Sequence, residues 1–305
     1  MVMSFDISST TVPPKGWRLW WIAARPRTLS LAATPVLVGS ALAWSEGSSP
    51  HALPALAALC SALLIQVGTN LHNDAADFES GNDGAERTGP TRVTAAGWAR
   101  PETVRKAALS AFGLALLLGG YLVFVGGWPI LAIGVASLLA GWAYSGGPHP
   151  VSHTPFGELF VWLFFGLVAV AGSHYLQSGV LTTSALWAGS ALGLLAAAVL
   201  MVNNARDRIG DLSAGRRTLA AVLGPAGAKW TYALMVLAPF LVSALLAIGE
   251  PPRLGVLLTL LVLPRCLILI RSFGQGEGAA LNQVLADTAR VCFFFGLLLA
   301  VGVLL

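Results

Sequence analysis

Hydrophobic residues are gathered into long, nearly uninterrupted runs along almost the whole chain, and most polar residues fall between these runs. A run of about 17 to 25 apolar residues has the length that an α-helix needs to cross a bilayer. Nine runs meet this requirement if the third and fourth are divided near Gly126 and Gly127. The runs are 28–45, 52–72, 107–126, 128–144, 157–177, 182–203, 230–249, 253–271 and 289–305. The pattern predicts an all-α membrane protein with about nine transmembrane helices, and we treat residues 1–305 as one domain.

The composition agrees with this prediction. Hydrophobic residues make up 56% of the 305 residues and charged residues only 10%, and the mean hydropathy is +0.74. A soluble domain needs more charge than this to keep its surface hydrated. Membrane lipid is therefore the expected surrounding of the chain.

The basic residues are distributed unevenly between the two sides of the predicted helices. Of the 18 Lys and Arg residues, all but Arg253 and Arg265 fall on the side of the N-terminus. Because cytoplasmic loops are enriched in Lys and Arg, this side is expected to be cytoplasmic, with the C-terminus periplasmic or extracellular. Residues 1–24 form a polar and then Trp-rich interfacial segment, without the order of a cleavable signal peptide. We expect a bacterial inner membrane.

Two of the cytoplasmic loops begin with Asn and Asp residues at the end of an apolar run. The first such segment extends from Asn70 to Asp83 and the second from Asn203 to Asp211. Carboxylates this close to the hydrocarbon are costly and usually serve an ion or a substrate. Four predicted helices separate the two segments, so both are expected to face the same side of the membrane.

The spacing within each segment suits one face of a helix. If the helices continue, Asn73 and Asp77 lie at i, i+4, and Asn203, Asp207 and Asp211 lie at i, i+4, i+8. Two acidic clusters that face one space repel each other unless cations lie between them. Mg²⁺ suits this arrangement, because it prefers carboxylate oxygens and shares them with phosphate and water.

Basic residues follow both acidic segments and change the choice of ligand. Arg87 and Arg92 follow the first segment, and Arg216 and Arg217 follow the second. Metal together with guanidinium groups favours a diphosphate. Two alternatives remain open: solvated helix ends with ordinary ion pairs, and a cation-coupled transporter. The transporter is disfavoured because the carboxylates lie at one membrane face and not near the midplane.

The paired motifs resemble those of the UbiA superfamily of intramembrane prenyltransferases. Asn73, Asp77 and Asp83 match its N-x-x-x-D-x-x-x-x-x-D pattern, and the second segment matches N-x-x-x-D-x-x-x-D. Further stretches are similar to the MenA branch, which prenylates 1,4-dihydroxy-2-naphthoate in menaquinone synthesis. These stretches are Arg25-Pro26-Arg27-Thr28-Leu29, Gly89-Pro90-Thr91-Arg92 and Tyr144-Ser145-Gly146-Gly147-Pro148 leading to Gly157-Glu158.

One departure from the wider superfamily favours this branch. Its 4-hydroxybenzoate enzymes usually carry Tyr-Pro-x-x-Lys-Arg after the fourth helix. The present chain has Tyr144-Ser-Gly-Gly-Pro-His149 there, without either basic residue. Other superfamily acceptors, namely 4-hydroxybenzoate, homogentisate or a porphyrin, remain the alternatives within the enzyme hypothesis.

The resemblance implies a helical bundle around a central cavity and a set of site residues. It implies that about two Mg²⁺ ions bind the diphosphate of a polyprenyl diphosphate through Asn73, Asp77, Asp83, Asn203, Asp207 and Asp211. The expected catalytic residues are Asp77, Asp83, Asp207, Asp211 and Tyr144. The expected substrate-binding residues are Arg27, Asn70, Arg92, Arg206, Arg216 and Glu158. The implied products are demethylmenaquinol, diphosphate and CO₂. Nucleic acid is not an expected partner, and neither donor chain length nor oligomeric state can be read from the sequence.

Overall fold

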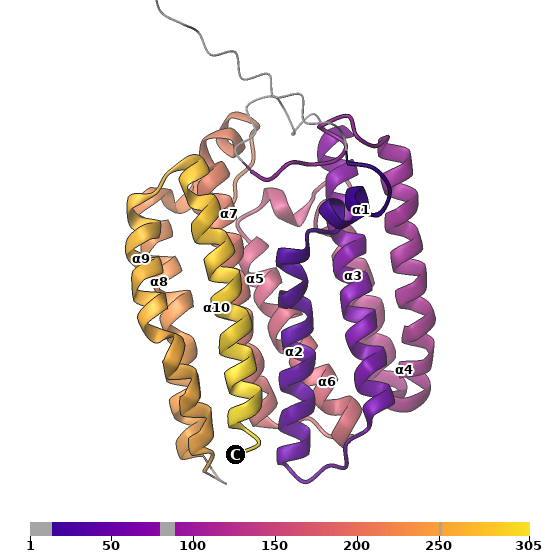
Figure 1. Cartoon of the computed structure of the whole chain (residues 1–305), viewed down its shortest axis with the longest axis vertical. Helices are drawn as coiled ribbons and strands as arrows, with labels where there is room; N and C mark the ends of the chain where they lie inside the picture. Colours follow the sequence, from indigo (N-terminus) through magenta and orange to yellow (C-terminus); the bar gives the residue numbers. More distant parts are fainter. Residues whose placement is uncertain (1–13, 80–88, 250–251) are drawn as a thin grey trace, which may run out of the picture.

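A computed structural model describes residues 14–79, 89–249 and 252–305, and these residues form a bundle of long helices without strands (Figure 1). The all-α prediction is confirmed. The helices are α1 (Trp17–Ala24), α2 (Pro26–Ser45), α3 (Ala52–Glu79), α4 (Pro101–Ala143), α5 (Gly157–Val161), α6 (Ala169–Ser178), α7 (Thr183–Ser213), α8 (Leu219–Ile248), α9 (Leu263–Gln275) and α10 (Leu281–Gly302). The 3₁₀ segments η1 (Val151–His153), η3 (Leu254–Val262) and η4 (Gly278–Ala280) and the π-helix η2 (Trp162–Val168) complete the described elements.

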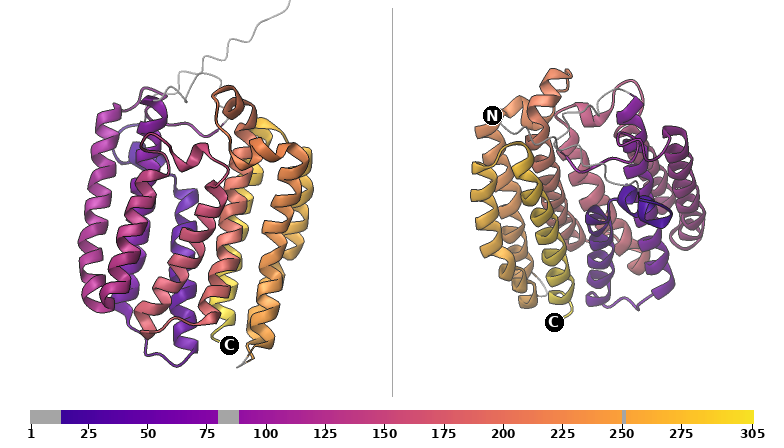
Figure 2. Two further views of the ribbon diagram at one scale, coloured as in Figure 1. Left: turned by 180° about the vertical axis from the view of Figure 1, so that it is seen from behind. Right: turned by 45° about the horizontal axis from the view of Figure 1, so that its top comes forward.

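Eight continuous helices in the described part of the chain are long and apolar enough to cross a membrane, which makes this a multi-pass membrane protein. One of them, α4, is two helices in sequence, because Gly127 has φ 67° and ψ −154°, outside the helical region. Arg105, near the start of α4, pairs with Glu79 at the end of α3. The two halves of α4 run in opposite directions along the bundle (Figure 2). Counting both halves of α4 gives the nine predicted crossings.

Several helices extend beyond the apolar runs from which they were predicted. The sixth run ended at 203, but α7 continues to Ser213 and carries the whole second acidic segment. The last run began at 289, but α10 begins at Leu281, because the buried carboxylate of Asp287 is bonded by Gln283, Arg265 and Arg290. These partners allow polar residues to join a buried helix.

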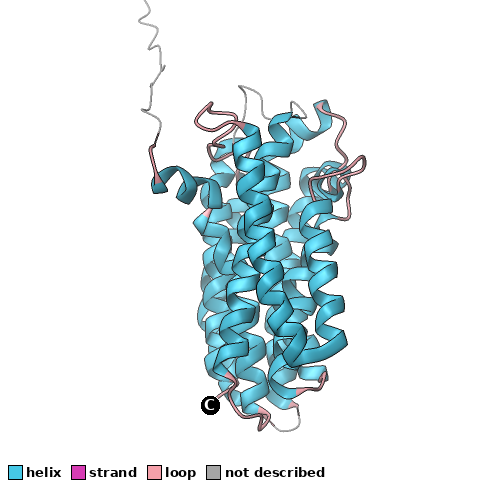
Figure 3. Cartoon of the chain, turned by 90° about the vertical axis from the view of Figure 1, so that its right-hand side faces the viewer, coloured by secondary structure: helices cyan, strands magenta, loops and turns pink. Residues whose placement is uncertain are grey.

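The first described helix lies across the bundle, not along it. Figure 3 shows α1 at one end, roughly perpendicular to the long helices. Trp17 is 70% exposed and Trp21 56%, as expected for aromatic anchors at a membrane interface. Arg25 separates α1 from α2 with a left-handed backbone, φ 52°, and Pro26 begins α2 at a position where its missing N–H is not needed.

Helix α7 forms the centre of the bundle and is the most thoroughly buried of the long helices. Its small residues allow close contact with the π-helix η2: a Cβ on Gly166 would lie 2.3 Å from the backbone oxygen of Gly189. Small residues permit such contacts between membrane helices. The outer faces carry large apolar side chains such as Leu117 and Phe124, which suits contact with lipid.

Candidate active site

A single large cavity joins the two acidic segments to the interior of the bundle. Its volume is about 2010 Å³, and side chains from α2, α3, α4, α7 and α10 line it. One end carries Asn73, Asp77, Arg92, Asp207, Asp211 and Arg216, and we call this the polar end. The other end is lined by residues such as Leu122, Ile130, Ile133 and Leu138, inside the predicted hydrocarbon region.

The described part of the first acidic segment, residues 70–79, is helical, as predicted, and the Asn73–Asp77 face lines the cavity. The Asp77 carboxylate forms ion pairs with Arg92 and with Arg216, the latter at 3.2 Å. Arg92 also donates to the backbone oxygen of Asn73 at 2.7 Å. The side-chain oxygen of Asn73 is buried and has no hydrogen-bond partner, so it can accept a bond from a ligand. Asp83 lies outside the described residues, and its predicted role stays a prediction.

Asp74 differs from Asn73 and Asp77 in the contacts that its side chain makes. Its carboxylate is 1% exposed and accepts the backbone N–H groups of Val93 and Thr94, each at 3.1 Å, together with the Thr94 hydroxyl. These bonds attach the segment that carries Arg92 to α3. Asp74 therefore positions Arg92 and does not line the cavity.

The second acidic segment is also helical, and Asn203, Asp207 and Asp211 line the cavity on one face of α7. Arg206 is 5% exposed and donates to Asp207 at 2.6 and 2.8 Å and to Asn203 at 2.9 Å. A further bond at 3.0 Å reaches Asn282 of α10. These contacts make Arg206 an internal counter-charge that arranges the acidic face. Arg206 also lines the cavity, and its predicted contact with diphosphate stays a prediction.

Arg216 connects the two acidic segments. Its guanidinium group lies 3.2 Å from Asp77 and 3.6 Å from Asp211, so α3 and α7 present their carboxylates to the same point. The Arg216 Nε is buried without a hydrogen-bond partner, which leaves one donor for an anion. Within the described ranges, no three His, Cys, Asp or Glu side chains gather closely enough to hold a metal ion by themselves.

The remaining predicted residues fall into two groups. Tyr144 and Arg27 line the cavity, and desolvation, followed by the nearby Glu158 carboxylate, raises the pKa of the Tyr144 phenol above its usual range. Tyr144 is therefore a hydrogen-bond donor at neutral pH. Asn70 lines the cavity but donates to Ala24 and Thr28, so it also joins α3 to the α1–α2 junction. Glu158 is 1% exposed and lies behind the cavity wall.

Comparison with known proteins assigns this architecture to a family. The sequence profile of the UbiA prenyltransferase family matches residues 32–304. The chain belongs to this family. It is 33% identical to the 1,4-dihydroxy-2-naphthoate octaprenyltransferase of Bacillus subtilis, over 94% of this chain and 93% of that protein. It is 34% identical to the enzyme of that name from Mycobacterium tuberculosis, over 92% of this chain and 95% of that protein.

A solved structure agrees with the fold. A UbiA homolog from Archaeoglobus fulgidus bound to GPP and Mg²⁺ superposes with a TM-score of 0.67 at 15% identity, covering 94% of this chain and 99% of that one. The family match and the named relatives confirm the predictions of the family and of a prenyltransferase enzyme.

Two parts of this UbiA-family site were not found from the sequence. Asn204 lines the cavity beside Asn203 and bonds to Glu158, although it is one residue away from the predicted face. Phe160 and Phe164 form an aromatic wall that continues from Tyr144. The adjacent pair Asn203-Asn204 was a signal that could have indicated Asn204. Nothing in the sequence distinguishes the two phenylalanines from the many other apolar residues.

Proposed function

We propose that this enzyme transfers a polyprenyl group from polyprenyl diphosphate to 1,4-dihydroxy-2-naphthoate, releasing diphosphate and CO₂ and forming demethylmenaquinol. The observation that carries the proposal is one cavity with a carboxylate- and arginine-rich end and a long apolar interior. The polar end matches the diphosphate of the donor, and the apolar interior matches its polyprenyl chain. The names of the relatives supply the class of acceptor.

The polar end suits a diphosphate together with a divalent metal ion. The unpartnered oxygen of Asn73 and the unpartnered Nε of Arg216 offer one acceptor and one donor there. Asn73, Asp77, Asn203, Asp207 and Asp211 would hold Mg²⁺, with phosphate oxygens completing its coordination. When bound, Mg²⁺ stabilises the charge of the departing diphosphate as a Lewis acid. Arg92 and Arg216 would share that charge.

The apolar interior suits the polyprenyl chain and the protection of a reactive carbon. As the allylic C–O bond breaks, its electron pair leaves with diphosphate. An electron-rich ring carbon forms the new C–C bond, and the ring carboxylate leaves as CO₂. Tyr144, Phe160 and Phe164 line this region, and their apolar surfaces exclude water that would otherwise capture the cation.

The choice of naphthoate over benzoate rests on one loop and on the relatives. The loop after α4 contains Pro148 and His149 where benzoate enzymes of the superfamily are expected to carry a basic pair. The C-terminal end of α3, which carries Asp77 of the polar end, and the described start of the chain lie at the same end of the bundle (Figure 1). The excess of basic residues favours a cytoplasmic location for that end. A bacterial inner membrane is part of the proposal.

Product formation by the purified protein in detergent tests the proposal. The reaction contains Mg²⁺, a polyprenyl diphosphate and 1,4-dihydroxy-2-naphthoate, with EDTA or 4-hydroxybenzoate in parallel reactions. Because Asp77 contacts two arginines at the polar end, Asp77→Ala is expected to lower kcat at least about a hundredfold. Glu102→Ala, which removes an exposed carboxylate at the start of α4, is the matched control. Turnover of benzoate alone would contradict the acceptor, and EDTA-resistant turnover would contradict the metal.

A further inference from the structure

A buried carboxylate–amide pair lies at the cavity wall, where Glu158 behind the wall is bonded to Asn204 of the second acidic segment. Glu158, at the start of α5, is 1% exposed, and its Oε1 accepts a hydrogen bond of 2.9 Å from Nδ2 of Asn204 on α7. The other carboxylate oxygen is buried and has no partner. Burying a carboxylate with so little compensation is costly, so a role in helix packing alone does not account for it.

The pair determines which end of the Asn204 amide is presented to the cavity. A carboxylate accepts hydrogen bonds only, so the NH₂ group must face Glu158. The carbonyl oxygen is then on the other side. Asn204 lines the cavity, and its oxygen is neither bonded to a described residue nor sealed from the cavity. Asn204 therefore offers a hydrogen-bond acceptor whose orientation is fixed from behind.

An aromatic wall lies on the same short helical segment as Glu158. The rings of Phe160 and Phe164 are 4.7 Å apart between centroids, and Tyr144 is 6.0 Å from Phe160. The π-helix that carries Phe164 is held against α7 by Gly166, which contacts the backbone of Gly189 and Gly193. The wall and Asn204 thus belong to two helices whose separation is fixed by backbone contact.

We propose that Asn204 accepts a hydrogen bond from a ring hydroxyl of the aromatic acceptor, and that Glu158 is the positioning residue that holds its amide. This inference rests on the proposed function. The carbonyl oxygen, with a carboxylate behind it, repels both the diphosphate and the carboxylate of the acceptor. The polyprenyl chain has no hydrogen-bond donor. Of the groups on the two substrates, only a hydroxyl of the acceptor fits, and the aromatic wall suits its ring.

Steady-state kinetics with three acceptors test the role of Asn204. The acceptors are 1,4-dihydroxy-2-naphthoate and its two mono-methoxy analogues, which cannot donate from the altered position. We expect the wild type to prefer the dihydroxy compound over one analogue, and Asn204→Ala to reduce that ratio of kcat/KM about tenfold. A merely structural defect would lower kcat/KM equally for all three acceptors and leave the ratio unchanged. That result would overturn the assignment.

Exchange of the pair tests the role of Glu158. In Glu158→Gln the glutamine NH₂ can donate a hydrogen bond, so the Asn204 amide is free to turn its own NH₂ toward the cavity. We expect KM for the aromatic acceptor to rise about tenfold and KM for the polyprenyl diphosphate to stay unchanged. In the double variant Glu158→Gln/Asn204→Asp, the new amide at position 158 donates a hydrogen bond to the new carboxylate at position 204. The other oxygen of that carboxylate again faces the cavity. Its acceptor KM is expected to return to within about threefold of the wild-type value.

A control and a decisive contrast complete the design. Gln283→Ala removes a comparable amide–carboxylate bond, 2.9 Å to Asp287, from a side chain outside the cavity wall, and is expected to leave both KM values unchanged. A wild type inactive on dihydroxynaphthoate would refute the proposed function itself. An active wild type whose pair variants change KM for the donor, or whose double variant does not recover, would refute the role of Asn204 and Glu158 alone.

Discussion

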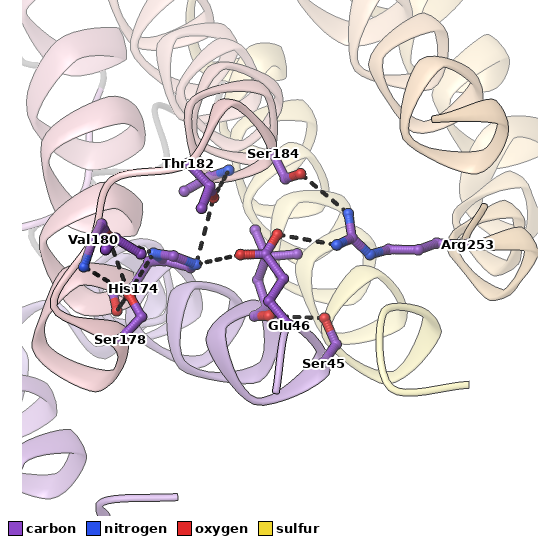
Figure 4. A network of polar contacts seen from close by, with 10 residues as sticks. Ser45, Glu46, His174, Ser178, Val180, Thr182, Ser184 and Arg253 are labelled. Atoms are coloured by element: carbon purple, nitrogen blue, oxygen red, sulfur yellow. Dashed lines mark hydrogen bonds and ion pairs between the residues drawn. The ribbon is translucent and has the colours of Figure 1, made fainter. Parts of the chain in front are cut away.

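Arg253 lies at the end of the bundle opposite to the acidic segments, where it belongs to a polar network (Figure 4). Its guanidinium group donates to Glu46 at 3.0 Å and to Ser184 at 3.1 Å. The second Glu46 oxygen lies 2.8 Å from Nε2 of His174, whose side chain is fully buried. Three separate parts of the chain, at the ends of α2, α6 and α8, are therefore joined through one carboxylate.

We expect Arg253→Met to destabilise the protein without affecting catalysis directly. Removing one partner of a buried ion pair costs about 3–5 kcal/mol, because the remaining charge loses its compensation. The Glu46 side chain is 17% exposed and retains His174, so we expect a smaller loss of about 2 kcal/mol. For a protein of this size, that loss lowers the apparent thermal midpoint by about 3 °C.

The shift is measured by thermal unfolding in detergent. A thiol-reactive fluorescent label reports unfolding, because it reacts with the buried cysteines as they become exposed. Arg265→Met is the matched control, because Arg265 is 51% exposed and its partner Asp287 keeps Gln283 and Arg290. Equal midpoints for the two variants would refute the reasoning. So would a loss of prenyl transfer in Arg253→Met well below its unfolding temperature, because the network lies at the far end from the polar residues of the cavity.

Three other substitutions have definite expected outcomes. Gly134 lines the apolar part of the cavity, and a Cβ added there meets no atom within 4 Å. Gly134→Leu is therefore expected to keep the fold but to shift product formation toward shorter donors. Gly113→Leu, at an equally unobstructed position outside the cavity, is expected to leave the preference for donor length unchanged. Asp74→Ala releases the segment that carries Arg92 and is expected to lower kcat/KM for the diphosphate donor more than tenfold, measured against a series of donor concentrations. Gly166→Ala places a methyl group 2.3 Å from a backbone oxygen of α7 and should cost at least about 2 kcal/mol, which a lowered thermal midpoint would reveal.

Much of the fold and part of the site follow from periodicity in the sequence. The apolar runs predicted the membrane helices because the bilayer fixes their length, and Gly126–Gly127 located the reversal within α4. The i, i+4 spacing of Asn73 and Asp77 predicted a shared face, because helices continue when their end residues find partners. Such features depend on neighbours along one helix.

The features that the sequence did not predict depend on contacts between helices. Arg206 was predicted to bind substrate, but its contact with Asn282, which lies on α10 and is distant in sequence, was not predicted. Glu158 was predicted to bind substrate, but its bond to Asn204 across the α5–α7 contact was not predicted. Neither distance nor side-chain direction between two helices can be obtained from the spacing within either one.

The charge balance of the polar end relates these contacts to binding. Of the described side chains there, Asp77, Asp207 and Asp211 are paired with Arg92, Arg206 and Arg216, so these three carboxylates are already compensated before any ligand binds. A diphosphate alone would compete with carboxylates for the arginines, and a divalent cation alone would compete with arginines for the carboxylates. Each would leave part of a buried pair uncompensated, which is costly. A metal–diphosphate complex carries charges of both signs and can replace both sets of contacts, so the same ion pairs that stabilise the unliganded cavity favour the binding of metal and diphosphate together.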